Sequence, residues 1–179
     1  MRTDLRRYAQ SQGGYTLVEL IVASAIGVLV MTGLTSVVLT STRAGQVATS
    51  RIEASAQVRN FESDAYGDFA LSQTTAISSC MPGDPPPCTI TLTGLRASNS
   101  PTPVATSYTV KYRWKDSNVD RQIGLDPNAP WVHAATNVTA FSAVFTGTAP
   151  YQTVVVTMTV TVNAYAETQS FRFDPRVNP

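Results

Sequence analysis

A long uncharged apolar stretch near the start of the chain constrains the fold most strongly. Residues 20–42 are twenty-three consecutive residues without a charge, and they are rich in Leu, Val, Ile and Ala. About twenty such residues in a helix are enough to cross the hydrocarbon core of a bilayer. The Ser and Thr side chains in the stretch can bond back to carbonyls of the same helix, so they do not prevent insertion. We therefore predict a membrane-inserted helix.

A short polar segment precedes this helix. Residues 1–14 hold Arg2, Arg6 and Arg7 against the single acid Asp4. An excess of arginine on a short flank keeps that flank cytoplasmic, so we expect the rest of the chain on the opposite side of the membrane. The apolar stretch is longer than the hydrophobic core of an ordinary secretory signal. We therefore expect it to stay on the protein.

The residues at the boundary form a specific motif. Glu19 stands inside the apolar segment, where an unpaired carboxylate costs several kcal/mol in lipid and so requires a partner. The segment reads Gly13-Gly14-Tyr15-Thr16-Leu17-Val18-Glu19-Leu20-Ile21-Val22-Ala23. This run resembles the N-terminal signature of type IV pilins and type II secretion pseudopilins, with its glycine, aromatic residue, short apolar run and glutamate.

The resemblance implies a processing event and a partner for the carboxylate. Prepilin peptidase would cleave between Gly14 and Tyr15, and the new N-terminus would be methylated. Glu19 would then pair with the N-terminal amine of a neighbouring subunit during filament assembly. Tyr15 stands where most of these proteins have Phe, and the membrane segment lacks the proline of many major pilins. The tyrosine keeps the aromatic ring and should affect cleavage little, whereas the missing proline favours a minor subunit over a major pilin.

Hydrophobic residues continue at helical spacing beyond the membrane segment. They recur at steps of three or four residues, or multiples of these, with charged residues between them: Val47, Ala54, Val58, Phe61, Ala65 and Phe69. We expect one helix from Tyr15 to about Leu71. Residues 15–42 would serve the membrane and the filament core, and residues 43–72 would form an amphipathic continuation that packs on a sheet.

From Gln73 the sequence changes to prolines and to strand-like alternation. Predicted strands cover residues 89–95, 107–115, 119–125, 138–145, 153–162 and 170–173. In residues 107–115 the alternation places Tyr108, Val110, Tyr112 and Trp114 on the core face, and Asp116-Ser117-Asn118 is predicted to form the turn that follows. A long helix followed by strands predicts an α+β fold, with the helix packed on an antiparallel sheet in residues 73–179.

Two later segments extend the resemblance. Residues 137–145, followed by residues 154–162, are similar to the late strands of J-type pseudopilins and PilW-like minor pilins. This similarity implies a minor pilin or pseudopilin within the larger family.

Cys80 and Cys88 enclose a short proline-rich segment. Two cysteines this close can form a disulfide in an exported domain, and free thiols are the alternative. Their spacing is not that of a zinc site, and His133, the sole histidine, leaves such a site one ligand short. We predict a disulfide, and its position far from the C-terminus again favours a minor subunit by comparison with major pilins.

The residue inventory favours no catalytic chemistry. His133 has no nucleophile elbow to serve, and the chain has no glycine-rich phosphate loop. The acidic residues Asp64, Asp68, Asp116 and Asp120 are expected to be solvated. We therefore predict no enzyme activity, no cofactor and no metal.

Nucleic-acid binding is a weaker alternative. Lys111, Arg113 and Lys115 share one face of a predicted strand, with Arg121 on the next strand. The aromatic residues lie on the opposite face, which indicates an ordinary basic solvent face. The formal charge is +1 for the whole chain, and ten basic residues face eleven acidic ones once residues 1–14 are removed. We do not expect DNA as a partner.

These observations predict a structural minor pilin or pseudopilin of a type IV pilus-like or type II secretion filament. Its partners would be other pilins, prepilin peptidase and, before assembly, membrane lipid. It would lie in the bacterial cytoplasmic membrane with its C-terminal domain outside, and later in a filament. The alternative is an uncleaved, single-pass membrane anchor that carries an extracytoplasmic interaction domain, with Glu19 snorkelling to the interface.

Overall fold

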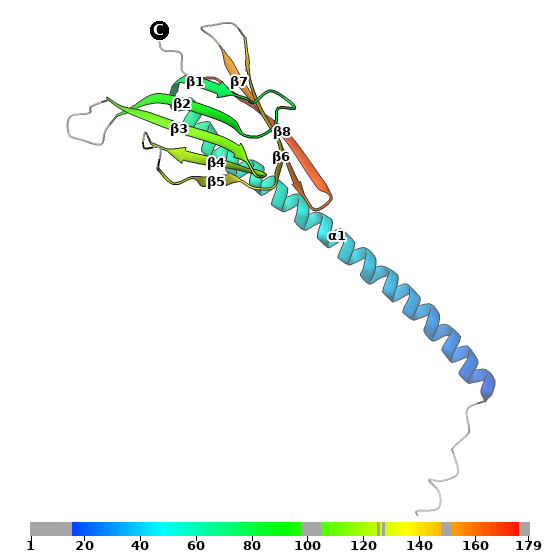
Figure 1. Ribbon diagram of the computed structural model, residues 1–179. Coiled ribbons are helices and arrows are strands. Elements are labelled where there is room, and N and C mark those ends of the chain that lie inside the picture. The colour runs from blue at the N-terminus through cyan, green and yellow to red at the C-terminus, as the bar shows by residue number, and fades with distance from the viewer. Residues whose placement is uncertain (1–15, 98–104, 125, 127, 148–151, 176–179) are drawn as a thin grey trace, which may run out of the picture. The chain divides into compact units, whose positions relative to one another are not determined.

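The computed structural model describes residues 16–97, 105–124, 126, 128–147 and 152–175 (Figure 1). One helix, α1 (Leu17–Leu71), is followed by eight strands. The chain divides into two compact units, Met1–Gln46 and Val47–Pro179, and α1 contributes residues to both.

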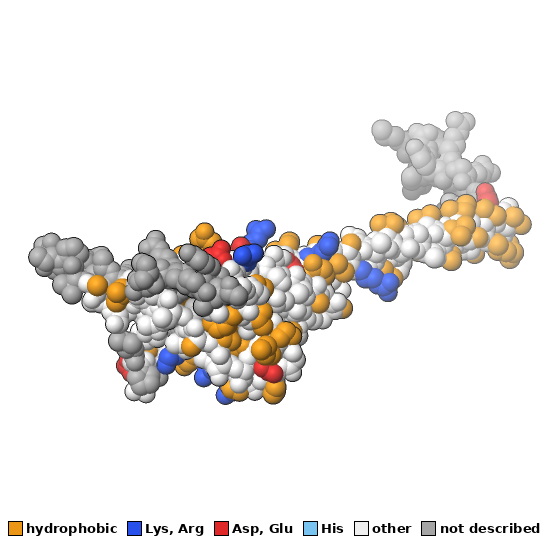
Figure 2. All heavy atoms as spheres, turned by 90° about the horizontal axis from the view of Figure 1, so that it is seen from above, with side chains coloured by type: hydrophobic (Ala, Val, Ile, Leu, Met, Phe, Trp, Pro, Cys, Tyr) orange, Lys and Arg blue, Asp and Glu red, His pale blue; other side chains and the backbone are white. Residues whose placement is uncertain are grey.

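In the first unit every described residue of α1 is exposed. Among the described residues, α1 is the one helix that is long and apolar enough to cross a membrane, and its best window has a mean hydropathy of 2.3 with none of it buried. Figure 2 shows hydrophobic side chains over this segment. Thr32, Thr35 and Thr40 each donate to the carbonyl four residues earlier, at 2.7–2.8 Å. Their hydroxyl groups are therefore satisfied within the helix, as membrane insertion requires.

The second unit contains two antiparallel sheets. The five-stranded sheet has the order β1-β2-β3-β4-β5, and the three-stranded sheet has the order β6-β7-β8. The strands of the first sheet are β1 (Ser72–Ser78), β2 (Cys88–Ala97), β3 (Ala105–Lys115), β4 (Asn118–Ile123) and β5 (Val132–Ala135). Those of the second are β6 (Val138–Thr146), β7 (Thr153–Val162) and β8 (Tyr165–Phe173).

The core forms where α1 meets both sheets. Phe61 is fully buried, and its ring lies 5.6 Å from that of Tyr112 in the first sheet. It also lies 5.7 Å from the ring of Phe141 and 5.5 Å from that of Phe171 in the second sheet. The side chain of Phe61 thus packs against both sheets. The predicted α+β fold, with a long helix packed on antiparallel strands, is confirmed. The sequence had suggested one sheet, whereas the structure has two.

The end of the helix is tightly packed against the second strand. Ser72 begins β1 directly after α1, donates its hydroxyl to the carbonyl of Phe69 at 2.8 Å and pairs with Gly94 on β2. A Cβ atom placed on Gly94 would collide with the carbonyl oxygen of Leu71. Glycine at this position therefore permits the close approach of two backbones.

Candidate processing and assembly site

The start of α1 is closed by reciprocal hydrogen bonds between Thr16 and Glu19. The amide of Glu19 donates to Thr16 Oγ1 at 3.3 Å, and the amide of Thr16 donates to Glu19 Oε2 at 3.1 Å. This arrangement is a capping box, which satisfies two amides that a helix start otherwise leaves unpaired. The Thr-x-x-Glu pattern was visible in the sequence, but the predictions above gave Glu19 only an intermolecular partner.

The capping box leaves one carboxylate oxygen available. The hydroxyl of Thr16 also donates to Glu19 Oε2, at 3.3 Å. Of the three hydrogen bonds, two are accepted by Glu19 Oε2 and one by Thr16 Oγ1. Among residues 16 onward that the structure describes, no hydrogen bond to Glu19 Oε1 is present. The predicted cleavage residues Gly14 and Tyr15 lie outside the described residues. A cleavage between them would place the new amine one residue before Thr16.

The predicted disulfide residues lie in the second unit. Cys80 and Cys88 are joined by a disulfide, with their Cα atoms 4.8 Å apart, and both residues are buried. Inside the loop, Asp84 accepts a hydrogen bond from the amide of Met81 at 2.8 Å. The carbonyl of Cys80 accepts one from the amide of Ala143 at 2.9 Å, which ties the loop to β6. The cross-linked loop is thus bonded to the three-stranded sheet as well as to the five-stranded one.

A buried ionic cluster joins α1 to the five-stranded sheet. Asp68 is only 3% exposed and accepts two hydrogen bonds from Arg121, both at 2.7 Å. The hydroxyl groups of Tyr108 and Tyr112 also donate to its carboxylate, each at 2.5 Å. The expectation that Asp68 is solvated was therefore wrong, because four donors replace water around its charge.

The cluster changes how its members titrate. Burial, reinforced by the hydrogen bond to Asp68, raises the pKa of Tyr108 to about 12. Burial and the nearby charge of Asp68 raise the pKa of Tyr112 further above its ordinary value. The hydrogen bonds to Asp68 raise the pKa of Arg121. All three shifts favour the protonated donors that hold the buried carboxylate.

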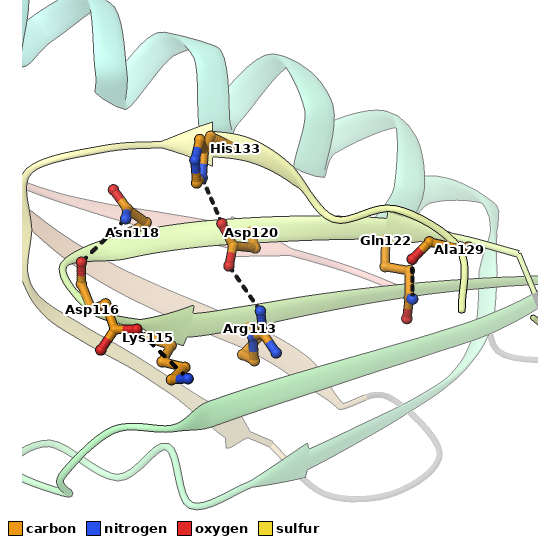
Figure 3. A network of polar contacts seen from close by, with 8 residues as sticks. All are labelled: Arg113, Lys115, Asp116, Asn118, Asp120, Gln122, Ala129 and His133. Carbon is orange, nitrogen blue, oxygen red and sulfur yellow. Dashed lines mark hydrogen bonds and ion pairs between the residues drawn. The ribbon is translucent and has the colours of Figure 1, made fainter. Parts of the chain in front are cut away.

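A second polar cluster lies on β3, β4 and β5 (Figure 3). Asp120 is 7% exposed; its Oδ1 lies 2.6 Å from His133 Nδ1, and its Oδ2 accepts from Arg113 at 3.1 Å. The guanidinium of Arg113 stacks 4.1 Å from the ring centre of Trp131. The expectation that Asp120 is solvated was also wrong.

The second cluster gives little support to metal or nucleic-acid binding. Within the described ranges, no group of three or more His, Cys, Asp or Glu side chains is placed to hold a metal ion. On the basic strand face, Arg113 is paired with Asp120, and Lys115 lies 3.6 Å from Asp116. Arg121 lies on the opposite face of the sheet, paired with Asp68. The four basic residues therefore do not form one unpaired patch for phosphates.

Comparison with known proteins points to the N-terminal segment. Residues 10–35 match the family model described as "Prokaryotic N-terminal methylation motif". No curated protein and no solved structure matches the chain. The matched range contains Gly14, Tyr15 and Glu19, and it supports a type IV pilin-like subunit. The J-type or PilW-like subtype stays a prediction.

Proposed function

We propose that this chain is a minor pilin or pseudopilin that is cleaved between Gly14 and Tyr15, methylated, and assembled into a filament. The observation that carries the proposal is the methylation motif over residues 10–35, followed directly by an exposed apolar helix. Such a motif belongs to structural subunits, so the proposed activity is assembly rather than turnover. The finer assignment to a J-type or PilW-like subunit rests on the similarity of residues 137–162 alone.

The apolar half of α1 has two suitable environments. It is out of water both in lipid and among the helices of a filament, so the hydrophobic effect favours neither strongly. Helix packing and polar pairs then decide whether the subunit moves from the membrane into the filament. Because opposite charges attract strongly where the dielectric constant is low, one pair between Glu19 and an incoming amine carries weight there.

The geometry of Glu19 suits two simultaneous roles. Oε2 receives the amide of Thr16 in its own helix, and Oε1, which accepts no hydrogen bond from the described residues, would receive the amine of a neighbouring subunit. A subunit held at that oxygen would take one axial position relative to its neighbour. Glu19 would then set the register of the filament.

Substitutions at Glu19 and Thr16 test this role. Glu19→Gln keeps a side-chain acceptor for the capping box but removes the charge that attracts an amine. Thr16→Ala weakens the cap but keeps the charge. We expect normal leader removal in both variants, a loss of about tenfold or more in filament incorporation for Glu19→Gln, and near-normal incorporation for Thr16→Ala. Mass spectrometry of the N-terminus and quantification of the protein that sediments with filaments provide the two readouts.

The outcomes separate assembly from simple helix stability. If Glu19→Gln is incorporated like the unchanged protein, the register role is refuted. If Thr16→Ala loses as much incorporation as Glu19→Gln, the capping box rather than the charge is what matters. If the unchanged protein is found only as an uncleaved membrane protein, the anchored interaction domain becomes the better description.

A further inference from the structure

The outer strand β8 lies alongside the second half of α1. At its start, the side-chain amide of Asn163 donates to Ser50 at 2.9 Å, and Ser55 donates to Glu167 at 2.7 Å. At its end, the ring of Phe173 stacks on that of Phe69 at 4.2 Å. β8 pairs with β7 on one side and with no other described strand (Figure 1). Its other side is a sheet edge beside the helix.

The pairing register shows which backbone groups face that edge. A two-residue turn joins Val162 to Tyr165, so these two residues form a hydrogen-bonded pair and every second pair after them does too. The intervening pairs turn their backbone groups away from the partner strand. The amide of Thr161 fits this scheme, because it donates to Asn137 rather than to β8. On β8, four exposed residues therefore direct their N–H and C=O groups outward: Ala166, Thr168, Ser170 and Arg172.

The other sheet edges are shorter, irregular or occupied. β5 has four residues, and its pairing with β4 is irregular. The pairing of β1 with β2 is irregular near Ser72. Two amides of β6 donate to carbonyls of other segments, Val138 to Ser117 and Ala143 to Cys80. β8 has nine residues, a regular register and no proline or lysine, and its charged residues are Glu167, which faces the helix, and Arg172. It is therefore the longest regular edge among the described strands, although it is not free of protecting charges.

A positively charged groove of about 700 Å³ lies between α1 and the start of β8. Arg51 and Arg59 line it from the helix, and Tyr165 and Glu167 line it from the strand. Glu167 accepts a hydrogen bond from Ser55, whereas Arg51 stacks 5.3 Å from the centre of the Tyr165 ring. Two guanidinium groups therefore face one carboxylate that is already hydrogen-bonded.

We propose that β8 is a docking edge for an extended acidic segment of a partner protein. The segment would add as a fourth strand, pairing its backbone with the outward groups of β8. Its side chains on the helix-facing side would enter the groove, where carboxylates would meet Arg51 and Arg59. A second copy of β8 does not supply this charge, because its only acid is Glu167. The site is independent of leader removal and of Glu19.

Hydrogen exchange of the full-length protein in detergent micelles tests the proposal with two peptides. The probe is a short, end-capped peptide of alternating Thr and Glu, and its matched control alternates Thr and Lys. We expect the acidic peptide to slow exchange of the Thr168 and Ser170 amides by at least about tenfold, because both lack a partner on β7. The amide of Gln169, already bonded to β7, should change little. The lysine peptide should protect none of them.

Charge reversal assigns the effect to the groove. Arg59→Glu should remove most of the protection given by the acidic peptide. Lys111→Glu, which reverses a charge on β3 outside the groove, should leave that protection intact. Protection by neither peptide, or equal protection by both, overturns the proposal. Protection that rises with protein concentration in the absence of peptide would instead identify a second copy as the occupant.

Discussion

Asp68 on α1 and Arg121 on β4 form a bidentate ion pair across the core, with Nε and Nη2 of the arginine each 2.7 Å from a carboxylate oxygen. The two residues are separated by 53 positions in the chain. The pair fixes the helix to the five-stranded sheet at one rotation, because the planar guanidinium can donate to both carboxylate oxygens only in this geometry.

Removal of the arginine should be costly. In Arg121→Met, Asp68 keeps its tyrosine donors but loses its ion-pair partner, so we expect the free energy of unfolding to fall by about 3 kcal/mol. The stability of Arg121→Lys should lie between those of Arg121→Met and the unchanged protein, since an ammonium group cannot reproduce both contacts. Thermal unfolding of the full-length protein in micelles, followed by near-ultraviolet circular dichroism, measures this. Arg59→Met, on an exposed face, is the control, and an equal loss in that variant would contradict the assignment.

The two tyrosines should make stability depend on pH in the alkaline range. In the unfolded chain Tyr108 loses its proton near its ordinary pKa of 10.0, whereas in the folded protein its pKa is about 12. The folded state therefore holds more protons between these values, and the free energy of unfolding should fall as the pH rises from 10 to 12. Below pH 10 the contribution is fully present.

Tyrosine variants isolate this effect from other alkaline titrations. Tyr108→Phe should show a shallower fall in melting temperature between pH 10 and 12 than the unchanged protein. Tyr66→Phe, at an exposed position of α1, should follow the unchanged protein. If the three proteins show the same slope, the cluster does not control the titration.

Two glycine substitutions should act in opposite directions. Gly94→Ala places a methyl group against the carbonyl of Leu71 and should lower stability by about 1–3 kcal/mol, as overpacking does. Gly67→Ala has no atom within 4 Å of the new group and lies in α1, where alanine is favoured by about 1 kcal/mol. Melting temperatures of the two variants provide the comparison. A neutral Gly94→Ala would show that the backbones can separate at no cost.

Periodicity predicted most of the fold because burial follows it. The long helix ends at Leu71 as expected, and β2, β3, β4, β6 and β7 were predicted from alternation. Of β8, only residues 170–173 were predicted, and its first five residues were missed. β1 was missed because its sequence, SQTTAIS, is largely polar. β5 was missed because four residues are too few for a pattern. The division into two sheets depends on contacts between distant segments, which one sequence does not display.

The ion pair of Asp68 and Arg121 was missed because the sequence predicted the wrong pairing register between β3 and β4. The sequence suggested a three-residue turn, Asp116-Ser117-Asn118. The structure has a two-residue turn, with positive φ at Asp116 and Ser117, so Asn118 pairs with Lys115. A shift of one residue moves every side chain of the next strand to the other face. Arg121 therefore lies beside Tyr112, facing α1, instead of on the basic solvent face.

At the N-terminal site, the motif around Glu19 was apparent from the sequence, and the matching family model covers it. The Thr16 cap could have been predicted from the Thr-x-x-Glu pattern. The availability of Oε1 could not, because it depends on the side-chain conformation of Glu19.

The central claim is the processing of one peptide bond, and mass spectrometry of the protein from its native membrane tests it directly. We predict a mature chain that begins at Tyr15 and carries one added methyl group on its N-terminal amine. In cells without prepilin peptidase the same protein should retain residues 1–14. If cells with the active peptidase also retain residues 1–14, the chain is not a processed pilin-like subunit, and Glu19 loses its proposed partner.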